Sequence, residues 1–315
     1  MSATATPSLS AAWSPRLIRM VSASGIFDPL HDELIAALHA CQLHATPRTV
    51  HSLRIATRKL GAFLLALQQQ HPRDSSLRRQ TRLAMHELKT VRQAAAVVRD
   101  LDVQRHLLAD LAASARSPGA GGGRLQTESR KMDNSLAHRR RRVATTLSET
   151  VAALTPALDL SLQPLARRIT HLHPIPLLAI AKEQSQCGAE ELRRVLLQRR
   201  AAGKQGLGSK GLHAYRKQTK AVRYLAEMET GSVLARELAT DIKMKLDAIG
   251  RWHDLALLSI AVKAALGSGS VLANTVKAAR RQALQLALQA VLSPAPHPRK
   301  ETGQRDATLH PATAA

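Results

Sequence analysis

The apolar residues of this chain recur at helical spacing over long stretches, and this pattern constrains its fold more than any other feature. Ala84, Leu88, Val91, Ala95 and Val98 follow one another at intervals of four, three, four and three residues, which is the spacing of a helical bundle seam. The hydrophobic share of 44% is rich in alanine and leucine, and these residues favour helix over sheet. The pattern therefore predicts an all-α protein.

The same period predicts four helices on each side of a proline-containing connection at residues 155–176. We expect a first four-helix bundle at 28–154 and a second at 177–292. Residues 1–27 and 293–315 are rich in small polar residues and proline and lack the apolar period, so we expect them to be disordered. The individual helices are expected near 30–38, 53–67, 74–115, 125–154, 177–200, 212–229, 232–266 and 271–292.

The two halves repeat one arrangement of basic residues. Positions i, i+3 and i+7 share a helix face, and two basic ridges result: His51, Arg54 and Arg58 in the first half, and His213, Arg216, Lys220 and Arg223 in the second. Lys89 and Lys243 fall at matching places ten residues before Arg99 and His253. Because we find no acid at helical spacing along either ridge, a ligand is expected to supply the negative charge. An ordinary solvated basic face is the alternative.

The charge balance points to a phosphate-rich partner. The chain has a formal net charge of +23, with 33 arginines and 13 lysines, and the planar guanidinium binds phosphate through two hydrogen bonds at once. Aromatic residues make up only 2% of the chain, too few for the stacking platforms of single-strand binders. A polyanion bound through its phosphates is therefore expected.

The histidines are not expected to bind a metal ion. Arginine occupies position i+3 after both His51 and His213 and would repel a cation. A hydrogen bond from each histidine to an anion fits better, and a helix cap is the alternative. Cys41 and Cys187 have neither disulfide-framework nor zinc-site spacing, and no cofactor is expected.

Acids accompany the bases deep in the third helix of each half. Asp100 follows Arg99, Asp254 follows His253, and Asp102 occupies the next seam position. Since the chain has no Walker loop, Gly-x-Ser-x-Gly or paired acidic motif, these acids are not expected to be catalytic. We expect them to orient the neighbouring bases, or to fix the packing of long helices.

The densest basic run, 139–142, is a weaker signal. Four consecutive residues cover most of a helical turn, so only Arg139 and Arg142 face one way. Such a run is common on solvated surfaces and in nonspecific nucleic-acid binders.

Four motifs in this order, at 50–60, 98–103, 212–225 and 250–255, resemble the CHAD family, the conserved histidine α-helical domain. The resemblance covers about residues 28–292. It implies two pseudo-symmetric four-helix bundles around a basic pore or cleft that binds inorganic polyphosphate without catalysis. The expected polyphosphate-binding residues are His51, Arg54, Arg58, Lys59, Lys89, Arg99, His213, Arg216, Lys217, Lys220, Arg223, Lys243 and His253, supported by Asp100, Asp102 and Asp254.

The chain departs from the family pattern in two places. Gly61 and Ala221 stand at positions that are usually basic. Some family members are fused to a triphosphatase with a Glu-x-Glu-x-Lys signature, but the nearest match, at 227–231, lacks the lysine. A triphosphatase is therefore not expected.

These observations predict a non-enzymatic polyphosphate-binding protein, cytoplasmic and associated with polyphosphate granules. No run approaches the roughly 20 apolar residues of a membrane span, so no membrane partner is expected. A monomer or homodimer fits equally well. The alternative is a nucleic-acid-binding or architectural protein that uses a diffuse basic surface.

Overall fold

The computed structural model describes residues 19–114, 122–202 and 209–293, which form eight α-helices and an isolated antiparallel bridge between Val21 and Ile175. The all-α expectation is confirmed. Most of the expected disordered ends lies outside the described residues, although the first helix begins before residue 28. The helices are α1 (Ala23–Leu43), α2 (Pro47–Gln70), α3 (Ser75–Ser114), α4 (Gly122–Ile169), α5 (Leu177–Ala201), α6 (Ser209–Met228), α7 (Val233–Leu266) and α8 (Val271–Leu292).

Side-chain caps determine where α2, which carries the first ridge, and α3 begin. Thr46 accepts a hydrogen bond from the backbone N–H of Thr49 at 3.2 Å, and Pro47 occupies the first turn of α2. Asp74 accepts from the N–H of Leu77 at 2.9 Å. Each cap satisfies a backbone donor that the first turn leaves unpaired, so the ridge of α2 starts one turn after a fixed helix end.

The helix α4 continues far beyond the expected boundary. The prolines at 156 and 164 predicted a connection over 155–176, but both lie inside a helix that ends at Ile169. Each proline removes a backbone hydrogen bond. The segment remains helical because its apolar face is fully buried through Leu158, Leu162, Leu165 and Ile169, and each such side chain contributes about 1.5–3 kcal/mol on burial.

The two hydrophobic cores do not follow the two halves of the sequence. One core joins α1, α2, the first part of α3 and the last part of α4 to residues of α5, α6 and the start of α7. The other joins the last part of α3 and the first part of α4 to the last part of α7 and to α8. The expected bundles at 28–154 and 177–292 therefore do not have separate cores, because the long helices α3, α4 and α7 each run through both.

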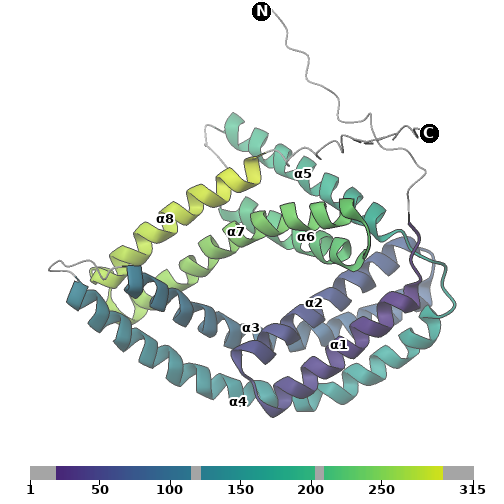
Figure 1. Cartoon of the computed structure of the whole chain (residues 1–315), viewed down its shortest axis with the longest axis horizontal. Coiled ribbons are helices and arrows are strands. Elements are labelled where there is room, and N and C mark those ends of the chain that lie inside the picture. Colours follow the sequence, from purple (N-terminus) through teal and green to yellow (C-terminus); the bar gives the residue numbers. More distant parts are fainter. Residues whose placement is uncertain (1–18, 115–121, 203–208, 294–315) are drawn as a thin grey trace, which may run out of the picture.

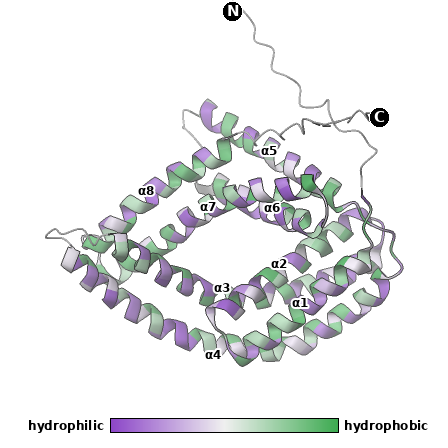
Figure 2. Cartoon of the chain, viewed as in Figure 1, coloured by the Kyte–Doolittle hydropathy of each residue, from purple (hydrophilic) through white to green (hydrophobic). Residues whose placement is uncertain are grey.

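The helices are arranged as a ring, and α2, α3, α6 and α7 lie on its inner side in this view (Figure 1). Contacts across this arrangement connect α2 with α6, α3 with α7 and α4 with α8. Every helix carries both polar and apolar residues, and apolar residues gather where α1, α2 and α4 lie together (Figure 2). Within the described ranges, none of the helices has an apolar stretch long enough to span a bilayer.

Candidate anion-binding cleft

A cleft of about 720 Å³ lies between α2, α3, α6 and α7. Ridges on α2 and α6 form two of its walls, and basic residues of α3 and α7 also line it. Asp100 and Asp254 line it as well. Ten of the thirteen predicted bases line the cleft: His51, Arg54, Arg58, Lys59, Arg99, Arg216, Lys220, Arg223, Lys243 and His253.

The two ridges lie close enough for their charges to repel one another. Burial, together with the charges of Arg58, Arg99 and Arg216, lowers the pKa of Arg54 to about 10. Burial, together with the charges of Arg58, Arg216 and Arg54, lowers the pKa of Lys220 to about 7. Because both α2 and α6 contribute to each shift, the cleft holds an excess of positive charge that a bound anion would relieve.

Three arginines of the cleft have a buried hydrogen-bond donor without an acceptor among the described residues, and of these Arg223 has an acid, Glu227, within ion-pair distance. Nη1 of Arg54 and Nε of Arg216 are buried, and neither has a hydrogen-bond acceptor among the described residues. A buried donor without an acceptor costs about 1–3 kcal/mol, and more when the group is charged. Both donors belong to ridge residues, so an anion in the cleft is the acceptor that fits them.

The histidines form a contact at the second ridge. The rings of His213 and His253 lie 5.8 Å apart between centroids. Burial, followed by the charges of Arg216 and the paired histidine, lowers the pKa of His253 to about 4. Burial and nearby arginines also lower the pKa of His51. These two rings are therefore neutral at pH 7, and each can donate one N–H to an anion.

The acids Asp100 and Asp254 line the cleft, as their places beside Arg99 and His253 suggested. Burial raises the pKa of both carboxyl groups against the opposing influence of the arginines, and the charge of Asp100 further raises the pKa of Asp254. Among the described residues neither makes an ion pair with a base. They reduce the positive charge of the cleft through space and do not hold its bases by hydrogen bonds.

Asp102 does not belong to the cleft, which corrects the third acidic prediction. Its Oδ1 accepts a hydrogen bond from Nε of Arg140 at 2.9 Å, and Arg140 also donates to the backbone carbonyl of Ala45. The seam position that Asp102 occupies directs it toward α4 and not toward the cleft. One arginine of the dense run is therefore a structural residue.

Three cleft bases have an acidic partner within ion-pair distance: Lys59 with Glu33 at 2.8 Å, Lys243 with Asp247 at 3.1 Å, and Arg223 with Glu227 at 3.3 Å. We expected no acid at helical spacing along either ridge. This is wrong for Arg223, because Glu227 follows it by four residues. The other ridge bases in the cleft have no such partner among the described residues.

The remaining three predicted bases lie outside the cleft. His213 contacts it only through the ring of His253. Lys217 is exposed because it follows Arg216 directly and is rotated by about 100° around α6. Lys89 is exposed as well, and it precedes the part of α3 that lines the cleft, 96–103.

Two of the lining residues that were not predicted, Arg251 and Tyr224, affect what the cleft can bind. Arg251 is exposed and lines the cleft from α7. The internal repeat did not predict this residue, because the matching position in the first half is Val97. Tyr224 lies beside the second ridge, and the guanidinium of Arg223 lies 4.7 Å from the centre of its ring. An arginine therefore covers this face of the tyrosine ring, so a nucleotide base cannot stack on it.

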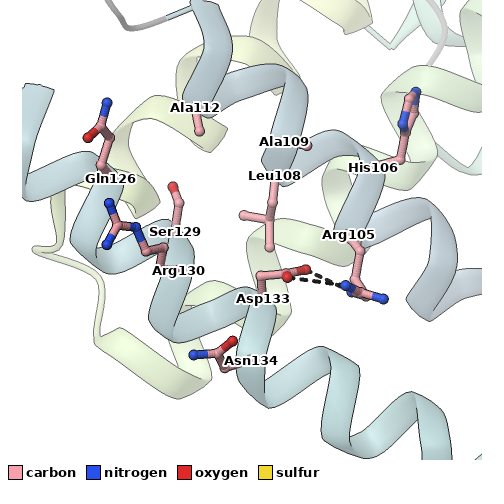
Figure 3. Close-up of a pocket in the computed structure, with 10 residues that line it drawn as sticks. All are labelled: Arg105, His106, Leu108, Ala109, Ala112, Gln126, Ser129, Arg130, Asp133 and Asn134. Carbon is pink, nitrogen blue, oxygen red and sulfur yellow. Dashed lines mark hydrogen bonds and ion pairs between the residues drawn. The ribbon is translucent and has the colours of Figure 1, made fainter.

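A second cavity, of about 610 Å³, lies between α3 and α4 (Figure 3). It contains none of the predicted bases. Its Arg105 is held by Asp133, with Nε and Oδ1 2.7 Å apart, and Leu108 and Ala109 form part of the lining. The cleft is therefore the stronger candidate for a polyanion. In the described part of the chain, no group of three His, Cys, Asp or Glu residues could hold a metal ion.

Comparison with known protein families agrees with this geometry. The sequence profile of the CHAD domain matches residues 29–263. The chain belongs to the CHAD family. The matched CHAD region contains α2, α3, α6 and all lining residues of the cleft, whereas α8 follows it.

Solved structures support the same fold. The crystal structure of the CHAD domain from the plant Ricinus communis is 20% identical, with a TM-score of 0.52, over 89% of this chain and 90% of that one. PptA from Streptomyces chartreusis is 15% identical, with a TM-score of 0.55, over 85% of this chain and 95% of that one. No curated protein matches the sequence.

Proposed function

We propose that this CHAD protein binds inorganic polyphosphate in the cleft between α2, α3, α6 and α7. The observation that carries the proposal is the pair of facing ridges, whose central arginines, Arg54 and Arg216, have buried donors without protein acceptors. Polyphosphate is the ligand that CHAD membership implies, and its closely spaced charges match a row of bases. We further propose that the protein associates with polyphosphate granules in the cytoplasm.

Binding is driven mainly by electrostatics. Lysine and arginine replace the counterions that condense on a phosphate chain, and the released ions favour binding at low salt. Removing the repulsion between the ridges adds to this effect. The affinity for polyphosphate should therefore fall steeply as the salt concentration rises.

We also propose that the protein does not hydrolyse its ligand. Hydrolysis of phosphoanhydrides generally uses a divalent metal held by acids, and Asp100 and Asp254 lie among arginines that would repel such an ion. Purified protein with added Mg²⁺ or Mn²⁺ should release no phosphate from polyphosphate, triphosphate or nucleoside triphosphates. Release that is lost on Asp100→Asn or Asp254→Asn would show that the protein is an enzyme.

Nucleic acid is the competing ligand, because the exposed arginines at 139, 141 and 142 could bind it nonspecifically. A cleft of about 720 Å³ between four helices suits a single phosphate chain better than a double helix, which would lie across its opening. Long polyphosphate should therefore not be displaced by duplex DNA at equal phosphate concentration. A pull-down of cellular polyanions, digested in parallel with a nuclease and an exopolyphosphatase, identifies the ligand. A pull-down that only the nuclease digests would contradict the proposal.

A further inference from the structure

Two smaller cavities adjoin the cleft, and each is a potential way out for a chain longer than the cleft. The first, of about 240 Å³, lies between α3 and α7 and shares Arg99, Val103, Arg251 and Asp254 with the cleft. The second, of about 410 Å³, lies at the start of α7 and shares only Glu227 and Lys243 with it. The first cavity is therefore the more continuous extension.

The exit between α3 and α7 offers bases that are available to an anion. Arg251 is exposed and has no ion pair within the described ranges. His106 is 79% exposed and follows Arg99 by seven residues, so it lies on the same face of α3 and about 10.5 Å further along the helix. Asp110 also lines this cavity, and its Oδ2 lies 3.9 Å from Nε2 of His106.

The exit at the start of α7 is less suited to phosphate. Glu227 and Glu229 both line it. The carboxylate of Glu229 is buried, with neither oxygen hydrogen-bonded to a described residue, and the base that this cavity shares with the cleft, Lys243, is paired with Asp247. Arg236 is exposed there and has no ion pair with another described residue, which makes it a matched counterpart of Arg251 on the same helix.

We propose that a polyphosphate chain longer than the cleft leaves it between α3 and α7, where Arg251 and His106 bind additional phosphates. This inference rests on the proposed function and adds a second binding site to it. It implies that long chains bind more tightly than short ones through contacts outside the cleft, and that the chain leaves in one preferred direction.

The test compares Arg251→Ala with Arg236→Ala against two ligands, tripolyphosphate and long-chain polyphosphate. Both variants remove one exposed arginine from α7, so both should fold and both lower the net charge equally. Arg251→Ala should weaken binding of the long chain about two- to fivefold, as expected for an exposed ion pair, and weaken tripolyphosphate binding by a smaller factor, because Arg251 lines both the cleft and the exit. The slope of log affinity against log salt concentration for the long chain should also become shallower by about one, as expected for the loss of one phosphate contact. Arg236→Ala should change neither affinity.

The outcomes separate this inference from the proposed function. Weaker long-chain binding in Arg236→Ala but not in Arg251→Ala would place the exit at the start of α7 and overturn the inference. Unchanged binding in both variants would also overturn it, while binding to the cleft itself would stand. If wild-type protein bound neither ligand, the proposed function would fail first. A further variant, His106→Gln, should weaken long-chain binding in the same direction as Arg251→Ala.

Discussion

Nε of Arg140 lies 2.9 Å from Oδ1 of Asp102, and this ion pair ties α4 to α3 where the two hydrophobic cores meet. On α3, Val98 belongs to one core and Leu101 to the other. The side chains of Asp102 and Arg140 are only 5% and 16% exposed. The pair therefore lies where the two cores meet and is largely shielded from solvent.

Removing one member of this pair should destabilise the protein strongly. In Arg140→Ala the buried carboxylate of Asp102 loses its partner, and breaking a buried pair in this way costs about 3–5 kcal/mol. The free energy of unfolding, measured by urea denaturation, should fall by this amount. Arg141→Ala is the matched control, because Arg141 is exposed and its loss should change stability by less than about 0.5 kcal/mol. Equal effects in the two variants would mean that the ion pair is not structural.

The periodicity of apolar residues predicted the helices well, and it failed where burial outweighed local sequence signals. The expected helix over 74–115 agrees with α3 at Ser75–Ser114, because Asp74 supplies a cap and the seam residues are buried. The prolines at 156 and 164 suggested a break that does not exist. Nothing local indicates that the face of α4 around them is covered by α1, so this part could not be predicted.

The site shows the same division between local and distant information. Helical spacing was enough to place Arg54 and Arg58 on one face. It could not show that Asp102 meets Arg140, 38 residues away, or that Glu33 on another helix pairs with Lys59. Contacts between distant segments decide which charges remain available to a ligand, and the sequence does not reveal them.

The facing ridges give the main test of the proposed site. Replacing Arg54, Arg58, Arg216 and Lys220 together with alanine should weaken polyphosphate binding more than tenfold, because each hydrogen bond to a charged group contributes about 1.5–3 kcal/mol. Binding can be followed by calorimetry at fixed salt. The variant should remain folded, since it removes mutual repulsion from the cleft, and circular dichroism checks this directly.

The control for this test removes four charges from the surface. Arg79, Arg139, Arg141 and Arg142 are all exposed, and their replacement with alanine lowers the net charge by the same amount. Arg140 is left out because of its structural role. The control should bind polyphosphate nearly as well as the wild type. Equal weakening in the two folded variants would favour the diffuse basic surface over the cleft.

Binding should depend on pH through Lys220. Its pKa is about 7 in the free protein because of burial and the neighbouring arginines, whereas an ordinary lysine titrates near pH 10.4. A bound polyanion restores the charge, so binding takes up a proton above pH 7. The contribution of Lys220 to the affinity should therefore be constant below pH 7 and fall by up to about tenfold per pH unit above it. Lys220→Arg keeps the charge and should remove this slope, and an unchanged slope would assign it to another group.

The same lysine affects the stability of the free protein with a defined sign. Between pH 7 and about 10.4 the unfolded chain binds a proton at Lys220 that the folded chain lacks. The contribution of Lys220 to the free energy of unfolding should therefore rise with pH in this window and be constant below pH 7. Comparing urea denaturation of wild type and Lys220→Met at pH 6 and about 9 isolates this contribution. A difference between the two proteins that does not change with pH would contradict the lowered pKa.

Gly250 gives a test of how closely the ligand approaches α7. It lies in the middle of that helix and lines the cleft, and a Cβ built on it would meet no other atom within 4 Å. Its φ is not positive, so neither packing nor backbone geometry requires glycine. Because glycine within a helix costs about 0.5–1 kcal/mol relative to alanine, Gly250→Ala should stabilise the free protein by that amount. If the phosphate chain passes close to the backbone here, the added methyl group should weaken binding severalfold.

The chain offers a matched control in Gly61, which also lies inside a helix, has no positive φ, and has open space at its Cβ. Gly61 does not line the cleft. Gly61→Ala should therefore stabilise the protein to a similar extent and leave polyphosphate affinity unchanged. Thermal denaturation and calorimetry of both variants separate the two effects, because only Gly250→Ala combines higher stability with weaker binding. If both variants gain stability and bind equally well, the ligand does not approach α7 at Gly250, and the polyphosphate must lie nearer to the ridges of α2 and α6.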